Sequence, residues 1–125
     1  MKITVEMRIH RTLSGIKRYS LASGHDDKLG EILGIYDNSP MDDHLTICRN
    51  GVFWIEAGVR EEICFSNIEK ISIKDNDKST DYLLINSIGK DKIIKLAVRG
   101  KNGKLSDLFE FMRFLNRVVS DLKQS

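Results

Sequence analysis

Residues 45–56 read LTICRNGVFWIE, and this stretch decides the fold. Two apolar segments, 45–49 and 52–56, flank the dipeptide Asn50-Gly51. Asn-Gly readily adopts the positive φ angles of a type I′ turn, whose twist matches that of two antiparallel strands. The stretch therefore predicts a tight β-hairpin with Asn50 and Gly51 at its tip.

Four more strands are predicted after this hairpin. Each segment is rich in apolar or β-branched residues and is bounded by turn residues such as Gly58 and Gly89. The segments are residues 61–65, 68–73, 82–88 and 92–98. Short strands at regular spacing are typical of an antiparallel sandwich or barrel.

The chain before the hairpin is patterned less evenly. Residues 2–10 alternate in polarity and predict a half-buried strand, with His10 on its polar face. Residues 11–44 are weakly patterned, and within them 16–21 and 31–36 predict two shorter strands joined by turn residues.

One amphipathic helix is predicted at the C-terminus, over residues 107–123. Its apolar residues recur at spacings of three and four, as on one face of a helix. They are Leu108, Met112, Leu115, Val119 and Leu122. We expect one mostly β domain of the α+β class, residues 1–125, in which a sandwich or partly open barrel of about seven strands is closed by this helix.

Composition is that of an ordinary globular domain, with 41% hydrophobic and 30% charged residues in 125. No apolar run approaches the roughly 20 residues that cross a bilayer, and the N-terminus alternates in polarity where a signal peptide would be apolar. These features predict a cytoplasmic protein. In that compartment Cys48 and Cys64, both within apolar segments, are expected to be free buried thiols.

The order of short antiparallel strands followed by one C-terminal helix resembles the bacterial pleckstrin-homology-like domains, over roughly residues 45–122. The likeness lies in Leu45-Thr46-Ile47 leading to Asn50-Gly51, in the FSNIEKI step at 65–71, and in the helix. The resemblance implies a binding scaffold rather than an enzyme. Lipid-binding members carry a basic cluster on the first hairpin; here only Arg49 lies beside the turn, which argues against phosphoinositide recognition.

Charge is unevenly distributed along the chain, although the net charge is only +2. Residues 24–44 hold six acids and one lysine; the acids are Asp26, Asp27, Glu31, Asp37, Asp42 and Asp43. Residues 90–104 hold six bases and one acid; the bases are Lys90, Lys92, Lys95, Arg99, Lys101 and Lys104. Such segments either steer a charged partner or form ordinary solvated faces.

No catalytic, metal or cofactor motif is complete. His25-Asp26-Asp27 and Asp42-Asp43-His44 combine imidazole with carboxylates, as metal sites do, but also have the composition of solvated turns, which is the interpretation we favour. Residues 75–79 resemble the start of a calcium loop without its later glycine and glutamate. The basic segment lacks stacking aromatics, which argues against nucleic-acid binding.

We therefore expect a non-catalytic module that binds another protein, and specifically an immunity protein that occludes a cognate bacterial toxin. The acidic segment is the expected contact surface and the basic segment a second one. Two alternatives stay open: a small-ligand or metal-binding domain or enzyme that uses the His/Asp clusters, and binding to an anionic membrane surface through Lys90 to Lys104.

Overall fold

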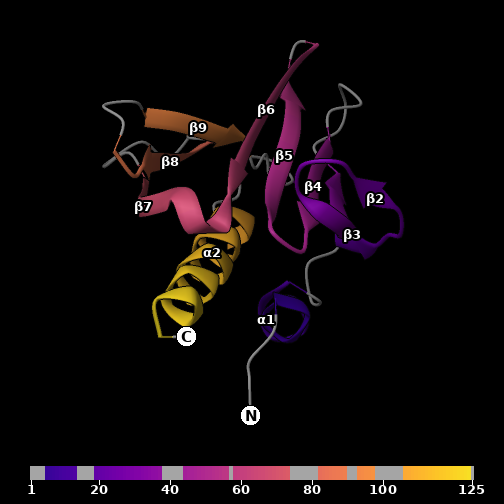
Figure 1. The fold of residues 1–125 in the computed structure, drawn as a ribbon, viewed down its shortest axis with the longest axis horizontal. Helices are drawn as coiled ribbons and strands as arrows, with labels where there is room; N and C mark the ends of the chain where they lie inside the picture. Colours follow the sequence, from indigo (N-terminus) through magenta and orange to yellow (C-terminus); the bar gives the residue numbers. More distant parts are fainter. Residues whose placement is uncertain are drawn as a thin grey trace.

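Two antiparallel sheets and two helices make up the described part of the computed structural model, which comprises residues 5–13, 19–37, 44–56, 58–73, 82–89, 93–97 and 106–124. Figure 1 shows the sheets on either side of the molecule, with the C-terminal helix below and between them. The predicted fold class, a mostly β arrangement with a C-terminal helix, is confirmed. Nine strands, rather than about seven, are present in the described residues.

The first sheet is built almost entirely from consecutive hairpins, in the order β1-β3-β4-β5-β6, with β2 also paired to β3. Its strands are β1 (Tyr19–Leu21), β2 (His25–Asp26), β3 (Gly30–Asp37), β4 (His44–Cys48), β5 (Gly51–Glu56) and β6 (Val59–Cys64). The predicted hairpin at residues 45–56 is confirmed as β4 and β5. Of the two shorter strands predicted in the weakly patterned region, 31–36 is confirmed within β3 and the described part of 16–21 is confirmed as β1. Residues 16–18 lie outside the described part of the chain.

The predicted position of the hairpin tip is wrong by one residue. Ile47 pairs with Val52, so the two turn residues are Arg49 and Asn50. Gly51 begins β5, and its φ is not positive. A Cβ there would lie 2.3 Å from the carbonyl oxygen of Ile63 on β6, so a close approach between strands, and not the turn, requires this glycine.

The second sheet contains three strands in the order β7-β8-β9. A short 3₁₀ helix, η1 (Phe65–Asn67), leads from β6 into β7 (Ile68–Ile73), which is followed by β8 (Tyr82–Ser87) and β9 (Ile93–Ala97). These strands confirm the prediction from β-branched runs. Side chains alternate across the sheet, and the row Ile71, Ile85 and Ile94 faces the core.

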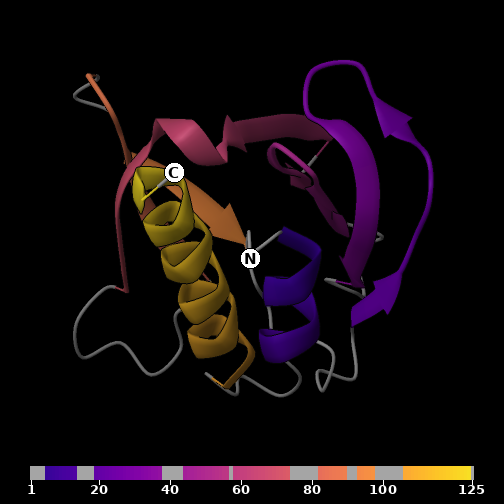
Figure 2. The ribbon, with the colours of Figure 1, turned by 60° about the horizontal axis from the view of Figure 1, so that its bottom comes forward.

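The strand predicted at residues 2–10 is wrong, because the chain there forms the helix α1 (Val5–Thr12). The alternating pattern is also compatible with a helix, since Val5, Ile9 and Leu13 recur every four residues and lie on one helical face. Ile9 and Leu13 are buried, and α1 packs beside α2, as Figure 2 shows. Residues 2–4 lie outside the described part of the chain.

The C-terminal helix α2 (Ser106–Gln124) confirms the helix predicted at 107–123 and joins both sheets. Phe111 meets Tyr36 of β3 edge to face at 4.9 Å between ring centroids. Phe114 meets Phe65 of η1 at 6.1 Å. The core thus lies between the two sheets and α2, whereas Leu122, expected on the buried stripe, is largely exposed. Neither helix has, among its described residues, an apolar stretch long enough to cross a membrane.

Candidate functional site

The acidic segment begins in the tight turn between β2 and β3, where the Asp26 side chain binds the backbone of the same turn. Its Oδ2 accepts hydrogen bonds from the backbone N–H groups of Lys28 (3.0 Å) and Leu29 (2.9 Å). Short acidic side chains favour such turns because they satisfy backbone donors locally. Asp27 is exposed in the same turn. Asp42, Asp43 and the side chain of Asp37 lie outside the described part of the chain.

Arg60 on β6 ties this turn to the outer face of the first sheet. Its Nη2 donates to Oδ1 of Asp26 at 3.0 Å, and its Nε lies 3.4 Å from Oε1 of Glu62. The guanidinium also lies over the ring of Phe53, 4.0 Å from the ring centroid. Lys28 completes the group, with its Nζ 3.6 Å from the same Glu62 oxygen. We call these five residues the Arg60 cluster.

The cluster sets the ionisation of Asp26. Desolvation acts to raise the pKa of this carboxyl, but the backbone N–H of Leu29, the Arg60 guanidinium and the N–H of Lys28 outweigh it and lower the pKa. Asp26 is therefore a carboxylate that holds Arg60 in place. It is not a freely available acidic contact.

A small apolar layer separates the turn from the sheet beneath it. Leu29 is fully buried, and its Cδ2 lies over Gly51, 2.9 Å from where a Cβ would stand. Cys48 and Cys64 occupy the neighbouring positions on β4 and β6, two strand spacings or about 10 Å apart, which is too far for a disulfide. Both thiols are free, as predicted, although only Cys48 is fully buried.

The Cys48 thiol is expected to be unreactive. Burial raises its pKa to about 11; the Asp26 carboxylate adds to this shift and the Arg60 guanidinium opposes it. Because the thiolate is the nucleophilic form, a thiol with this pKa stays protonated at neutral pH. Cys48 therefore packs as an apolar side chain.

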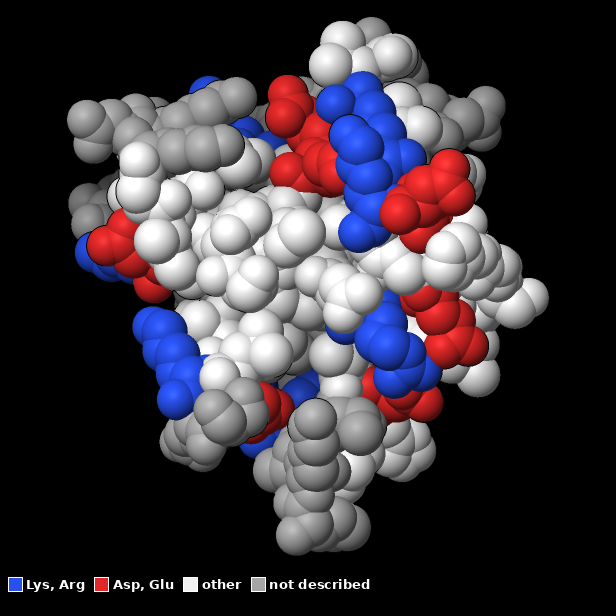
Figure 3. Space-filling model, viewed as in Figure 1, with Lys and Arg blue, Asp and Glu red and all other residues white. Residues whose placement is uncertain are grey.

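A second charged group joins α1 to the same sheet. Arg49, at the hairpin tip, lies 2.5 Å from the Glu6 carboxylate of α1 and donates to Glu31 of β3 at 2.6 Å. A bidentate pair between Arg8 and Asp121, at 2.8 and 2.7 Å, then joins α1 to α2. Figure 3 shows blue and red atoms intermixed on the side of the molecule that carries these groups.

Two acids of the acidic segment are therefore compensated by bases that are distant in the sequence. Asp26 pairs with Arg60 and Glu31 pairs with Arg49, across separations of 34 and 18 residues. A count of charges along the chain does not reveal such pairs, because the bases follow the acids later in the sequence and reach them only through folding. Local sequence offers no signal for the Arg60 cluster.

One exposed aliphatic residue extends the Arg60 cluster near the end of the β5–β6 hairpin. Ile55 pairs directly with Arg60 across the two strands and is 41% exposed. Val59 is 59% exposed but pairs with Glu56, and alternation places it on the other face of the hairpin. Ile55, Phe53 and Arg60 form what we call the Arg60 surface: an arginine stacked on an aromatic ring and bordered by an aliphatic side chain. No motif in the sequence marks these residues.

The basic segment is described only in part. Lys95 is exposed on β9, whereas Lys90, Lys92, Arg99, Lys101 and Lys104 lie outside the described part of the chain. Lys95 shares the outer face of the second sheet with Lys70 on β7, because Ser72, Leu84 and Lys95 form one cross-strand row and Lys70 lies in the next. The structure thus adds a lysine from an earlier strand.

The two His/Asp clusters are not brought together at their histidines. His25 pairs with Glu31 at one end of β3, and His44 pairs with Asp37 at the other end. Six residues of extended strand separate these positions, or about 20 Å. Within the described ranges no group of three or more His, Cys, Asp or Glu side chains could hold a metal ion.

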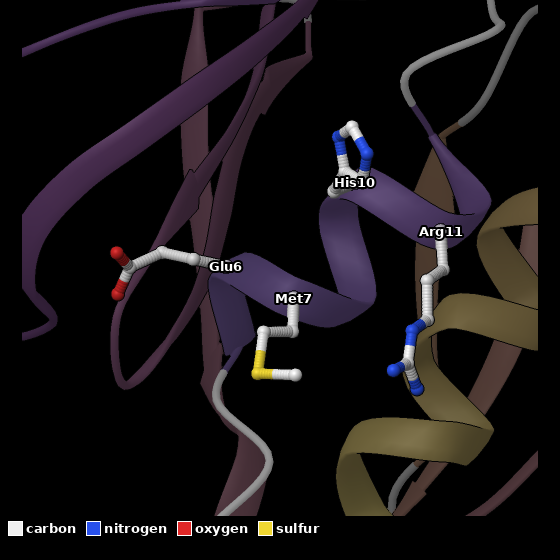
Figure 4. A pocket seen from close by; sticks show the side chains of 4 residues that line it. All are labelled: Glu6, Met7, His10 and Arg11. Atoms are coloured by element: carbon white, nitrogen blue, oxygen red, sulfur yellow. The ribbon is translucent and has the colours of Figure 1, made fainter.

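A shallow pocket of about 400 Å³ lies on the outer side of α1, lined by Glu6, Met7, His10 and Arg11. Figure 4 shows that Glu6, His10 and Arg11 point in different directions, and Arg11 reaches toward α2. Glu6 is paired with Arg49. Catalytic groups must converge on one reacting atom, and these side chains do not.

Comparison of the chain with protein-family models, with curated proteins and with solved structures finds no match.

Proposed function

We propose that this chain is a non-catalytic protein-binding module whose contact area is the Arg60 surface. The observation that carries the proposal is the placement of Arg60: its guanidinium stacks on Phe53 and is fixed by Asp26, while 38% of its side chain stays exposed. Arginine and aromatic residues dominate the energetics of protein interfaces, and groups held in place before binding lose less entropy when a partner docks.

The aliphatic border of this surface fits the same role. Interfaces place apolar side chains at the centre of the contact and polar groups around it. Ile55 supplies such apolar area, and Lys28 and Glu62 supply a polar rim of both signs. A partner with an aliphatic patch and a carboxylate opposite Arg60 would complement it.

The order of elements supports the same class of function. Four antiparallel strands, β3 to β6, are followed by three, β7 to β9, and then by α2. This order resembles that of pleckstrin-homology-like domains, which implies a binding scaffold. Within the protein-binding class we propose an immunity protein that occludes a cognate toxin. Asp26 of the acidic segment then positions Arg60 and is not itself the main contact.

A binding experiment tests the surface. Immobilised wild type is compared with Ile55→Asp and Arg60→Ala in extract of cells that carry the gene, and Arg113→Ala, on the exposed side of α2, is the matched control. We expect a stoichiometric partner that wild type and control retain and the two surface variants lose. A partner retained equally by all four proteins would overturn the assignment of this surface.

The toxin hypothesis needs a separate readout. The product of the adjacent reading frame is expressed in cells with and without this chain, and growth is measured. Growth that is restored by wild type and not by Arg60→Ala supports occlusion through the Arg60 surface. A neighbour that is harmless alone, or toxic regardless of this chain, contradicts the immunity assignment and leaves the binding assignment to the first experiment.

A further inference from the structure

The first sheet has two edges, and β6 forms one of them. The other edge strand, β1, has three residues, whereas β6 has six, which is an ordinary strand length. Figure 1 shows β6 along the rim of this sheet, and no described strand lies beside its first half on the side away from β5. The longer edge of the sheet is therefore open next to the Arg60 surface.

The strand register shows which backbone groups face this open edge. The N–H of Phe65 donates to the carbonyl of Asn50 at 3.0 Å, and hydrogen-bonded pairs alternate along an antiparallel ladder. The β6 residues that bond to β5 are therefore every second one: Ile63, Glu61 and Val59. The N–H and C=O groups of Arg60 and Glu62 point the other way. Nothing else in the described part of the chain bonds to these backbone groups.

An edge with unpaired backbone groups is a template for one more strand. Native chains guard such edges with charged side chains, and β6 has three in a row: Arg60, Glu61 and Glu62. Charges that reject most strands also select a strand whose charges are complementary. The side chains of β6 therefore define the strand that this edge accepts.

The two faces of β6 differ in how their charges are paired. Arg60 and Glu62 lie on the face of the Arg60 surface, where they contact each other and also Asp26 and Lys28. Glu61 lies on the opposite face, and within the described residues its side chain has no hydrogen-bond or ion-pair partner. Glu61 is therefore the acid of this edge that still lacks a base.

A second copy of the chain does not fit this edge. Symmetric antiparallel pairing of two β6 strands about the middle of the strand places either Glu61 or Glu62 opposite the same residue of the other copy. Like charges directly opposite each other destabilise a strand pair. The strand that fits must instead carry a base opposite Glu61.

We infer that the protein partner adds an extended strand to β6, antiparallel to it. The inference rests on the proposed function and specifies the partner segment that contacts the Arg60 surface. Opposite Arg60 this strand carries a carboxylate on the face of that surface, and opposite Glu61 it carries a base on the other face. Main-chain bonds to Arg60 and Glu62 supply affinity, and the two charged side chains supply specificity.

A synthetic peptide tests the edge without the natural partner. The probe is a blocked octapeptide with the central sequence Thr-Lys-Asp-Val, which in antiparallel pairing places its Lys opposite Glu61 and its Asp opposite Arg60. It is added to the ¹⁵N-labelled full chain up to about 5 mM, because a single short strand binds weakly. We expect the amide signals of Arg60 and Glu62 to shift saturably. The absence of a shift at these two amides would overturn the inference.

Two methylated forms of the peptide separate strand pairing from charge attraction. Methyl groups on the backbone nitrogens of its Thr and Asp block the donors that face Arg60 and Glu62, and should weaken binding at least about tenfold. Methyl groups on the nitrogens of its Lys and Val lie on the far side of the added strand and should change binding less than about twofold. Both forms have the same charge. Equal affinities would mean that the peptide binds without pairing, which contradicts the inference.

A proline at the edge tests pairing with the natural partner. Glu62→Pro removes an N–H that the ladder does not use, and edge strands accept proline at such positions. Glu62→Thr is the matched control, because it removes the same charge and keeps the N–H. From extract of cells that carry the gene, the proline variant should capture about a tenth or less of the partner that the threonine variant captures. Far-UV circular dichroism confirms that both are folded; if the proline variant is not, the methylated peptides decide.

The outcomes separate this inference from the proposed function. If Ile55→Asp loses the partner while Glu62→Pro and Glu62→Thr retain it equally, the Arg60 surface is the contact and no strand is added, so this inference alone fails. If Ile55→Asp retains the partner, the proposed contact surface itself fails. A wild-type dimer that Glu62→Pro dissociates, measured by sedimentation, would assign the edge to a second copy and likewise contradict the inference.

Discussion

The two sheets bury one face in the same way and use their other face differently. On the first sheet the outer face carries acids and bases in pairs, and these pairs fasten the β2–β3 turn and α1 to the strands. On the second sheet the described outer positions carry two lysines, aliphatic residues and Asn86, and exposed Glu69 lies beside Lys70 in β7. The ion pairs of the first sheet join segments that are distant in the sequence, whereas the outer side of the second sheet is a mixture of charged, polar and aliphatic residues.

On the first sheet, packing contributes more than charge to the free energy that holds the β2–β3 turn on the strands. Solvent-exposed ion pairs contribute about 0–1 kcal/mol each, because water screens them and long side chains lose freedom. Leu29, by contrast, is fully buried over Gly51 beneath the charged layer. The ion pairs orient the turn, and the apolar layer supplies the free energy. Substitutions that remove one layer at a time test this division.

The largest expected effect is that of Gly51→Val. The added side chain would meet the Ile63 carbonyl and the Cα of Cys64, and backbone atoms cannot move aside as a side chain can. We expect a loss of about 3 kcal/mol or more in the free energy of unfolding, measured with urea. Gly89→Ala is the control on the second sheet, where nothing lies within 4 Å and only the positive φ opposes alanine, at about 1 kcal/mol. Equal losses would contradict the close-approach explanation.

Leu29→Ala should have the next largest effect. It removes a fully buried side chain and leaves a cavity between the turn and the sheet, which costs about 2–3 kcal/mol in unfolding free energy. Ile93→Ala removes a similar side chain from an exposed position on the second sheet and should cost less than about 0.5 kcal/mol. A Leu29→Ala loss no greater than that of Ile93→Ala would mean that the turn is not packed on the sheet.

The sequence alone could predict the elements that have a regular local pattern of apolar residues. Strands with regular alternation, such as β7 to β9, and the long amphipathic helix α2 follow from local periodicity. The secondary structure of residues 5–12 is ambiguous from sequence, because an i, i+4 apolar spacing and strict alternation coincide there. Packing against α2 stabilises the helix. The role of Gly51 depends on β6, which pairs with it only after folding.

The candidate sites depend on the same distinction. The acidic segment is visible in the sequence as a run of charge, but the pairing of Asp26 with Arg60 and of Glu31 with Arg49 depends on the strand register. Likewise the meeting of Lys70 and Lys95 on one face follows from the pairing of β7, β8 and β9. Residues that act together across strands have no fixed spacing in sequence, so pattern analysis cannot find them.

A smaller effect is expected from pH at the Arg60 cluster. The pKa of Asp26 is lowered in the folded state, so its carboxylate stabilises the fold above the ordinary pKa of 3.8 and this stabilisation is lost as the pH falls below it. Asp26→Asn should therefore be less stable than wild type at pH 7, and the difference should shrink at about pH 3. Thermal unfolding at both pH values measures it. A difference that is unchanged at low pH would mean that the charge of Asp26 contributes nothing.

The smallest effect is expected at exposed positions on the outer side of the second sheet. Lys70→Glu and Ile93→Ser change side chains that lie exposed there and outside the hydrophobic core. Each should alter the free energy of unfolding by less than about 0.5 kcal/mol, as is usual for surface positions away from special contacts. Urea unfolding should then show unchanged midpoints for both variants. A loss above about 1 kcal/mol would show that this face, like the outer face of the first sheet, holds the fold together, and the contrast between the two sheets would fail.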